Sequence, residues 1–173
     1  MSTLEPFKID LKGLDDGLTK FAFSLDRAFF EAVEAQDVSD GDVQVALDVQ
    51  RTGSVFTLDF HVGGTVVVAC DLCLDDMELP IAGDYRLSAK FGEENAEDDD
   101  LITVAESEGI LDTAWLVYEQ VALAIPIKHV HAPGKCNVAM TRKFEELSAA
   151  RSSDEGEPAM DPRWSALLNL KKE

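Results

Sequence analysis

The chain has 173 residues and a mass of 18.9 kDa, which is enough to bury an apolar core without disulfides or metal ions. Its 15 basic and 34 acidic residues give a formal charge of −19, which argues against a protein that grips nucleic acid through its phosphates. Because 46% of the residues are apolar, we expect the acidic side chains to lie on the surface of a folded protein.

The amino-terminal third predicts two short strands followed by a helix. Apolar and polar residues alternate over 7–11 and again over 21–25, which is typical of strands with one buried face. Asp26 is suited to cap a helix that runs to about Ala35.

The middle of the chain predicts an antiparallel meander over 43–91. Alternating residues over 43–49 and 56–62 flank a Thr52-Gly53-Ser54 turn, which indicates a hairpin with one buried face. The pair Gly63-Gly64 predicts another turn, leading into a buried strand over 65–69, and the alternation returns over 85–91.

The remaining elements are a short strand over 101–104 and two helices. Asp112 or Thr113 caps the first helix, whose apolar positions recur at helical spacing until Pro126 ends it. Residues 149–160 are small, polar and acidic and predict a linker, after which Asp161-Pro162 begins a short helix over 161–173. The predicted fold is α+β, with an antiparallel meander or barrel-like sheet and a few helices in a single domain over 1–148.

The negative charge is concentrated in one part of the chain. Residues 1–127 contain 27 acidic and 7 basic residues, a net charge of −20, whereas residues 128–173 contain 7 acidic and 8 basic, a net charge of +1. The acidic block over 93–100 predicts a solvated loop, which either serves solubility alone or docks a basic protein.

The cysteine usage and the apolar stretches indicate a cellular compartment. Three cysteines and the lack of a basic-plus-apolar amino-terminal segment lead us to expect a reducing compartment, the cytoplasm. The longest apolar stretch, 113–127, contains Glu119 and is shorter than the roughly 20 residues that a membrane span needs. We therefore expect no contact with a membrane.

The cysteines are the residues with the strongest potential for site chemistry. Cys70 and Cys73 form a C-x-x-C where a strand runs into a turn, and Cys136 follows His129 and His131 in a loop beyond the long helix. Cys70, Cys73 and Cys136 with one of these histidines make a Cys3His zinc set, and we prefer the H-x4-C pairing with His131. The alternative is three free thiols that are simple core residues.

Catalytic readings of the same residues have weaker support. A redox role for the C-x-x-C lacks a following helix whose amino terminus would lower a thiol pKa. A nucleophile made from Cys136 and His131 lacks nameable oxyanion donors, and the sequence has no phosphate-binding glycine loop. We expect His61 to be an ordinary exposed histidine and Glu119 to face solvent at the edge of its helix.

Three blocks of the sequence resemble the YceD family, named for accumulation of large-subunit ribosomal RNA. Cys70-Asp71-Leu72-Cys73-Leu74 is similar to the family's C-x-R-C-L, with Leu72 in place of arginine. The second block runs from Ile110 to Cys136 and includes the Ile125-Pro126 helix end and the H-x4-C element, and the third is Asp161-Pro162-Arg163-Trp164 with Leu167 and Leu170. Together they cover 65–171. Many relatives carry further cysteines after the position of Cys136, where this chain has Asn137-Val138-Ala139-Met140, so a four-thiolate site is not available.

The resemblance implies a non-enzymatic factor in large ribosomal subunit biogenesis. Combined with the charge distribution, it leads us to expect that the acidic body binds a basic ribosomal protein or assembly factor. Asp161, Arg163 and Trp164 are the candidate partner-binding residues of the near-neutral carboxy-terminal segment, which would approach large-subunit ribosomal RNA or a second partner. Two alternatives stay open, a thiol-based redox or hydrolytic enzyme and an acidic binding module unrelated to ribosomes.

Overall fold

The structure is a computed structural model that describes residues 3–98 and 100–147. It contains the following elements, in chain order: the 3-10 helix η1 (Glu5–Phe7), β1 (Lys8–Asp10), β2 (Gly17–Leu25), α1 (Arg27–Ala32), β3 (Asp40–Thr52), β4 (Val55–Ala69), β5 (Asp76–Gly92), β6 (Ala96–Asp98), β7 (Leu101–Ala105), β8 (Ile110–Asp112), α2 (Ala114–Ala124) and α3 (Val138–Leu147). The fold is α+β, as predicted.

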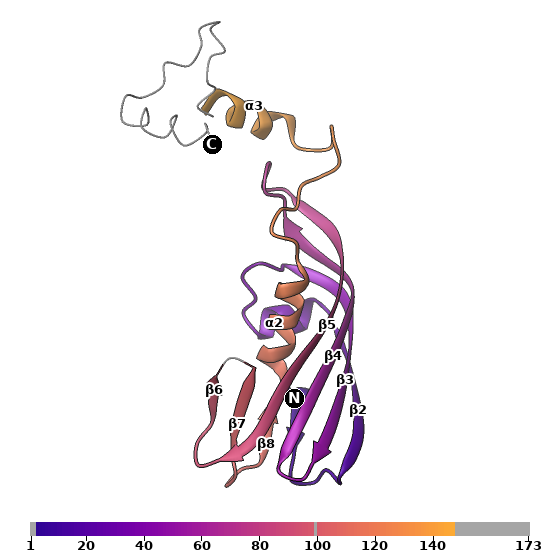
Figure 1. The fold of residues 1–173 in the computed structure, drawn as a ribbon. Helices are drawn as coiled ribbons and strands as arrows, with labels where there is room; N and C mark the ends of the chain where they lie inside the picture. Colours follow the sequence, from indigo (N-terminus) through magenta and orange to yellow (C-terminus); the bar gives the residue numbers. More distant parts are fainter. Residues whose placement is uncertain (1–2, 99, 148–173) are drawn as a thin grey trace, which may run out of the picture.

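The main element is a six-stranded sheet in the order β2-β3-β4-β5-β7-β6, with a separate two-stranded β1-β8 pair (Figure 1). β3 to β5 form the antiparallel meander predicted over 43–91, and β2 extends it by pairing with β3. β7 then pairs with β5 in parallel, Ser88 opposite Leu101. The outer strands β2 and β6 do not pair with each other, so the sheet is open rather than a closed barrel. Its buried face is covered by α2 and α1 instead.

The core consists of the alternate residues of the long strands together with the two covering helices. Phe56, Leu58 and Phe60 of β4 are fully buried, as are Val117 and Val121 of α2. The opposite face of the sheet is polar and carries short cross-strand ion pairs. This division explains how an acidic chain folds: its apolar residues fill one face and its charges occupy the other.

The helix starts follow the sequence prediction closely. Asp26 caps α1, and its side chain accepts a hydrogen bond from the backbone N–H of Phe29 at 3.1 Å. At α2 the carboxylate of Asp112 accepts from the N–H of Ala114 at 3.0 Å, while Thr113 donates its hydroxyl to the Phe7 carbonyl at 2.7 Å. Thr113 is therefore the N-cap residue of α2 and ties it to the amino-terminal segment, while the preceding Asp112 supplies the side-chain acceptor at the helix start.

The turn predicted at Gly63-Gly64 is wrong, because β4 runs without interruption from Val55 to Ala69. A Cβ on Gly64 would lie 2.2 Å from the backbone oxygen of Asp42. The glycine is needed because β3 passes so close, and the strand continues through it rather than reversing.

The acidic block was expected to be a loop, but three of its residues form the strand β6, which pairs with β7. Asn95 supports this ribbon, since its side-chain oxygen accepts a hydrogen bond from the Ala105 N–H at 2.7 Å. Asp99 lies outside the described residues, as do the predicted linker and the predicted helix over 161–173. No helix in the described part of the chain is long and apolar enough to cross a membrane.

Candidate metal centre

The turn between β4 and β5 carries the C-x-x-C at one end of the molecule. Within this turn the Cys70 N–H donates to the Asp75 carbonyl, and the Leu74 N–H donates to the Cys70 carbonyl, each at 2.9 Å. Leu74 adopts a left-handed conformation with φ of 62°, which closes the turn directly after the second cysteine. The turn buries both side chains, leaving Cys70 0% and Cys73 1% exposed.

The segment that follows α2 brings the other two residues to this turn (Figure 1). It is joined to the turn by a reciprocal pair of hydrogen bonds: the Asp71 N–H donates to the His129 carbonyl at 3.0 Å, and the His129 N–H donates to the Asp71 carboxylate at 2.7 Å. Farther along, the side-chain amide of Asn137 donates to the Asp75 carboxylate at 3.2 Å. These bonds place His131 and Cys136 against the C-x-x-C.

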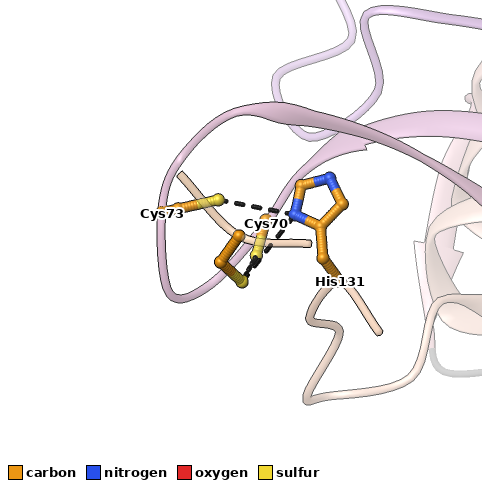
Figure 2. Close-up of side chains that lie close together, drawn as sticks. Cys70, Cys73 and His131 are labelled. Carbon is orange, nitrogen blue, oxygen red and sulfur yellow. Dashed lines mark hydrogen bonds between the residues drawn. The ribbon is translucent and has the colours of Figure 1, made fainter. Parts of the chain in front are cut away.

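Figure 2 shows the side chains of Cys70, Cys73 and His131 converging from the two segments. The Cys73 sulfur lies 3.4 Å and the Cys136 sulfur 4.0 Å from Nδ1 of His131, and the sulfurs of Cys70 and Cys136 are 3.9 Å apart. All four donor atoms lie within 4.8 Å of one another.

These distances fit a tetrahedral zinc ion. Bond lengths of about 2.3 Å to sulfur and about 2.0 Å to nitrogen place tetrahedral ligand atoms roughly 3.8 Å apart for two sulfurs and roughly 3.5 Å apart for sulfur and nitrogen. The Cys73–His131 and Cys70–Cys136 separations match these values, whereas the Cys136 sulfur, 4.0 Å from Nδ1 of His131, would have to move closer by roughly 0.5 Å on binding the ion. With four protein donors, such a site would be closed, leaving no position for a reacting water.

The orientation of His131 also suits a ligand. Its Nε2 lies 3.3 Å from the backbone carbonyl of Asp76, which can accept a hydrogen bond from a protonated Nε2 and so leave the Nδ1 lone pair directed at the thiols. A backbone carbonyl behind a ligating histidine is the common means of fixing its tautomer.

The thiols differ in acidity. Burial raises the pKa of Cys70, but hydrogen bonds with the backbone of His131, Cys73 and Leu72 outweigh it and lower the pKa to about 6. Burial raises the pKa of Cys136, and its interactions with Cys70 and Cys73 raise it further, to about 11. The Cys70 position thus already favours a thiolate, the form that binds metal.

The cluster offers little to a Cys-His nucleophile. The Cys136 thiol, which would have to attack as the thiolate, has its pKa raised to about 11, and the more acidic Cys70 is completely buried. A redox role is also poorly served, because the C-x-x-C is followed by a strand, β5, and not by a helix.

Other residues singled out in the sequence lie elsewhere. His129 is outside the cluster: its Nδ1 faces the Pro126 carbonyl at 3.0 Å, and its Nε2 lies 3.5 Å from Asp71. His61 is exposed, as expected, and pairs with Asp84 at 2.6 Å. Glu119 is half-buried rather than fully solvated, and accepts a hydrogen bond from the Trp115 indole at 2.7 Å. Asp161, Arg163 and Trp164 lie outside the described residues.

Asp71 was not among the residues predicted from the sequence, although its carboxylate joins the two halves of the cluster. Its position inside the C-x-x-C was the available signal, because an acidic residue there can accept backbone N–H groups from a neighbouring segment. The helix α3 was not predicted either, although its Met140, Phe144 and Leu147 recur at helical spacing. No residue from 122 to 147 is buried, so this segment has no core of its own.

Comparison with protein families matches residues 58–171 to the family described as "Large ribosomal RNA subunit accumulation protein YceD". The match contains all four cluster residues and the carboxy-terminal block. No curated protein matches the chain, and no solved structure matches it.

Proposed function

The chain belongs to the YceD family of large ribosomal RNA subunit accumulation proteins, and we propose that it acts in large ribosomal subunit biogenesis as a non-enzymatic binding protein. The single observation that carries this proposal is the family match over 58–171. On this proposal the acidic body binds a basic ribosomal protein or assembly factor.

The charges of the body support a basic protein as the partner. Five of the seven cations in residues 1–127 form ion pairs within the described residues, in the pairs Lys8–Glu5, Lys20–Asp48, Arg27–Glu31, Arg51–Asp16 and Arg86–Asp59. The remaining excess of acidic groups attracts a cationic surface and repels the phosphates of RNA. Contact with ribosomal RNA would then be indirect or made by the carboxy-terminal segment, with Arg163 and Trp164.

We further propose that Cys70, Cys73, His131 and Cys136 hold a structural zinc ion. The spacing of the donor atoms and the backbone carbonyl behind His131 support this assignment. The ion would fasten the segment after α2 to the tip of the β4–β5 hairpin. It would thereby set the direction in which the carboxy-terminal segment leaves the body.

The biological role is tested in a strain that lacks the protein. Sucrose gradients should show a deficit of large subunits that the wild-type gene restores. In a pull-down with the full chain as bait, basic ribosomal proteins should co-purify at low salt. The association should persist after ribonuclease treatment and weaken as added salt screens the charges. Normal levels of large subunits in the deletion strain would contradict the ribosomal role. If the co-purifying proteins are lost after ribonuclease treatment, the partner is RNA and not a basic protein.

The metal is tested by elemental analysis of protein purified without chelators. We expect about one zinc per chain for a closed four-ligand site. A content near contamination level would make the cysteines ordinary core residues. Slow alkylation of the thiols that accelerates when chelator is added would support the same assignment, whereas fast alkylation of the loaded protein would favour a reactive thiol.

A further inference from the structure

A groove of about 850 Å³ lies at the opposite end of α2 from the cysteines. Its walls come from β6 and β7 at one edge of the main sheet, from β8 of the two-stranded pair, and from the first turn of α2 (Figure 1). The groove is part of neither the cluster nor the polar outer face of the sheet. No role described above uses it.

The interior of the groove is apolar and partly open to solvent. Its floor is formed by buried side chains, among them Val104, Leu111 and Leu116. Above them Trp115 is 51% exposed and Ile110 is 39% exposed. An exposed tryptophan in an apolar depression is typical of a surface that anchors an apolar side chain of a partner.

The rim of the groove is negative. Glu97, Glu108 and Asp112 line it, and Lys8, the one cation among the described residues of the lining, is held by Glu5 at 2.7 Å. The sequence has no lysine or arginine between Phe91 and Ile127, and in the sequence the acidic residues Glu93, Glu94, Asp98 and Asp100 stand on either side of the groove residues 95–97.

A further carboxylate adjoins the groove through Trp115. Glu119 accepts the hydrogen bond of the Trp115 indole at 2.7 Å. Burial raises the pKa of Glu119, and the charge of Glu97 raises it further, against the lowering effect of Trp115. Both acidic groups therefore lie in a region where a cation would relieve electrostatic repulsion.

We propose that this groove docks a lysine- or arginine-rich polypeptide segment that inserts an apolar side chain beside Trp115. The inference rests on the proposed function and names the site at which the basic partner binds. The apolar floor supplies the anchor contact, and the acidic rim supplies charge complementarity. The same rim disfavours RNA and a second copy of this acidic chain.

The test uses the full chain both as wild type and with Trp164→Phe. The wild-type affinity shows whether Trp164, itself a candidate partner-binding residue, contributes to binding, and the variant leaves Trp115 as the one tryptophan of the sequence. The probe is a short labelled peptide of alternating lysine and leucine, compared with peptides in which the leucines become serine or the lysines become glutamate. We expect the lysine–leucine peptide to bind and to shift the fluorescence emission of Trp115. Its affinity should fall as the salt concentration increases from about 50 to about 200 mM. The other two peptides should bind at least tenfold more weakly.

Two substitutions locate the binding. Glu97→Lys and Ile110→Ser alter the rim and an exposed wall residue, and each should weaken binding by roughly tenfold or more. Asp42→Lys makes the same charge change on the opposite face of the sheet and should leave the affinity within about twofold. Circular dichroism of each variant checks that the fold is retained.

Several results would overturn the inference. If Asp42→Lys and Glu97→Lys weaken peptide binding equally, the binding depends on net charge alone and not on the groove. If the lysine–serine peptide binds as tightly as the lysine–leucine peptide, no apolar side chain is anchored. A large gain in peptide affinity in the variant Leu167→Asp/Leu168→Asp would assign the groove to the chain's own carboxy terminus. Self-association that Ile110→Ser abolishes would assign it to a second copy.

Complementation separates this inference from the proposed function. If deletion of the gene leaves large-subunit levels normal, the proposed function fails. If deletion lowers those levels and the Glu97→Lys/Ile110→Ser double variant restores them as well as wild type does, the groove assignment alone fails. The expected result is a deficit that this variant cannot restore.

Discussion

The sheet body, residues 3–69, 76–98 and 100–124, and the cysteine end, residues 70–75 and 126–147, are held together by different means. The body has a continuous apolar core in which Phe56 and Phe60 are fully buried. In the cysteine end only the two thiols of the C-x-x-C are buried, while Leu74 is 66% and Ile127 103% exposed. Hydrophobic burial therefore accounts for the body, whereas the cysteine end depends on a few hydrogen bonds and on the cluster.

Because the two regions are held together differently, we expect a defect in the apolar core to destabilise the body far more than any change in the cysteine end does. Phe60→Ala removes a completely buried ring from β4 and should lower the free energy of unfolding by about 3–5 kcal/mol. Urea denaturation followed by far-ultraviolet circular dichroism measures this loss. The molecules that remain folded should retain their full zinc content, and a parallel loss of metal would show that the two regions are not independent.

Removal of one metal ligand should affect the cysteine end and leave the sheet body stable. His131→Asn takes away the Nδ1 donor, and zinc affinity should fall by a hundredfold or more, above the roughly 10–100-fold typical of outer-shell changes. Hydrogen exchange should accelerate over 70–75 and 126–137 while β3 and β4 stay protected. The matched control is His61→Asn, an exposed histidine on the sheet that should keep full affinity. Loss of protection across the whole sheet would contradict the division into two regions.

The pH dependence of metal binding should follow the two perturbed thiols. At neutral pH Cys136, with a pKa of about 11, carries a proton that zinc must displace, whereas Cys70, with a pKa of about 6, is already a thiolate. Apparent affinity should therefore rise with pH across the neutral range, by about tenfold per unit for each proton displaced. Below about pH 6 the slope should steepen because Cys70 is protonated as well. Competition titrations with a zinc indicator measure this slope, and a flat profile would exclude thiolate ligation.

The sequence predicted the body well because alternation reports which face of a strand is buried. The hairpin of β3 and β4 and the Asp26 cap of α1 follow directly from that pattern and from local capping chemistry. The strand break at Gly63-Gly64 was predicted wrongly because glycine marks both turns and close backbone approaches. Only the position of β3 distinguishes the two cases.

Contacts between residues far apart in the sequence could not be predicted from the alternation of apolar and polar residues. The parallel pairing of β7 with β5 and the strand β6 inside the acidic block depend on contacts between distant residues. The cluster itself was predicted by ligand spacing, including the preference for His131 over His129. Ligand spacing did not identify Asp71, because the hydrogen bond that its carboxylate accepts from His129 joins residues 58 positions apart in the sequence.

The smallest expected effects come from two aspartates that make similar hydrogen bonds in the two regions. Asp26 caps α1 in the body, and Asp26→Ala should cost about 1 kcal/mol of global stability without changing zinc affinity. Asp71 holds the His129 backbone in the cysteine end, and Asp71→Ala should weaken zinc binding by about tenfold while the urea midpoint of the sheet stays unchanged. Each variant removes a carboxylate that accepts a hydrogen bond from a backbone N–H, and Asp71 in addition lies 3.5 Å from Nε2 of His129. Opposite outcomes would show that the effect of losing such a carboxylate depends on the region in which it lies. If Asp71→Ala lowered the urea midpoint as much as Asp26→Ala, the cysteine end would have to be part of the body's cooperative unit.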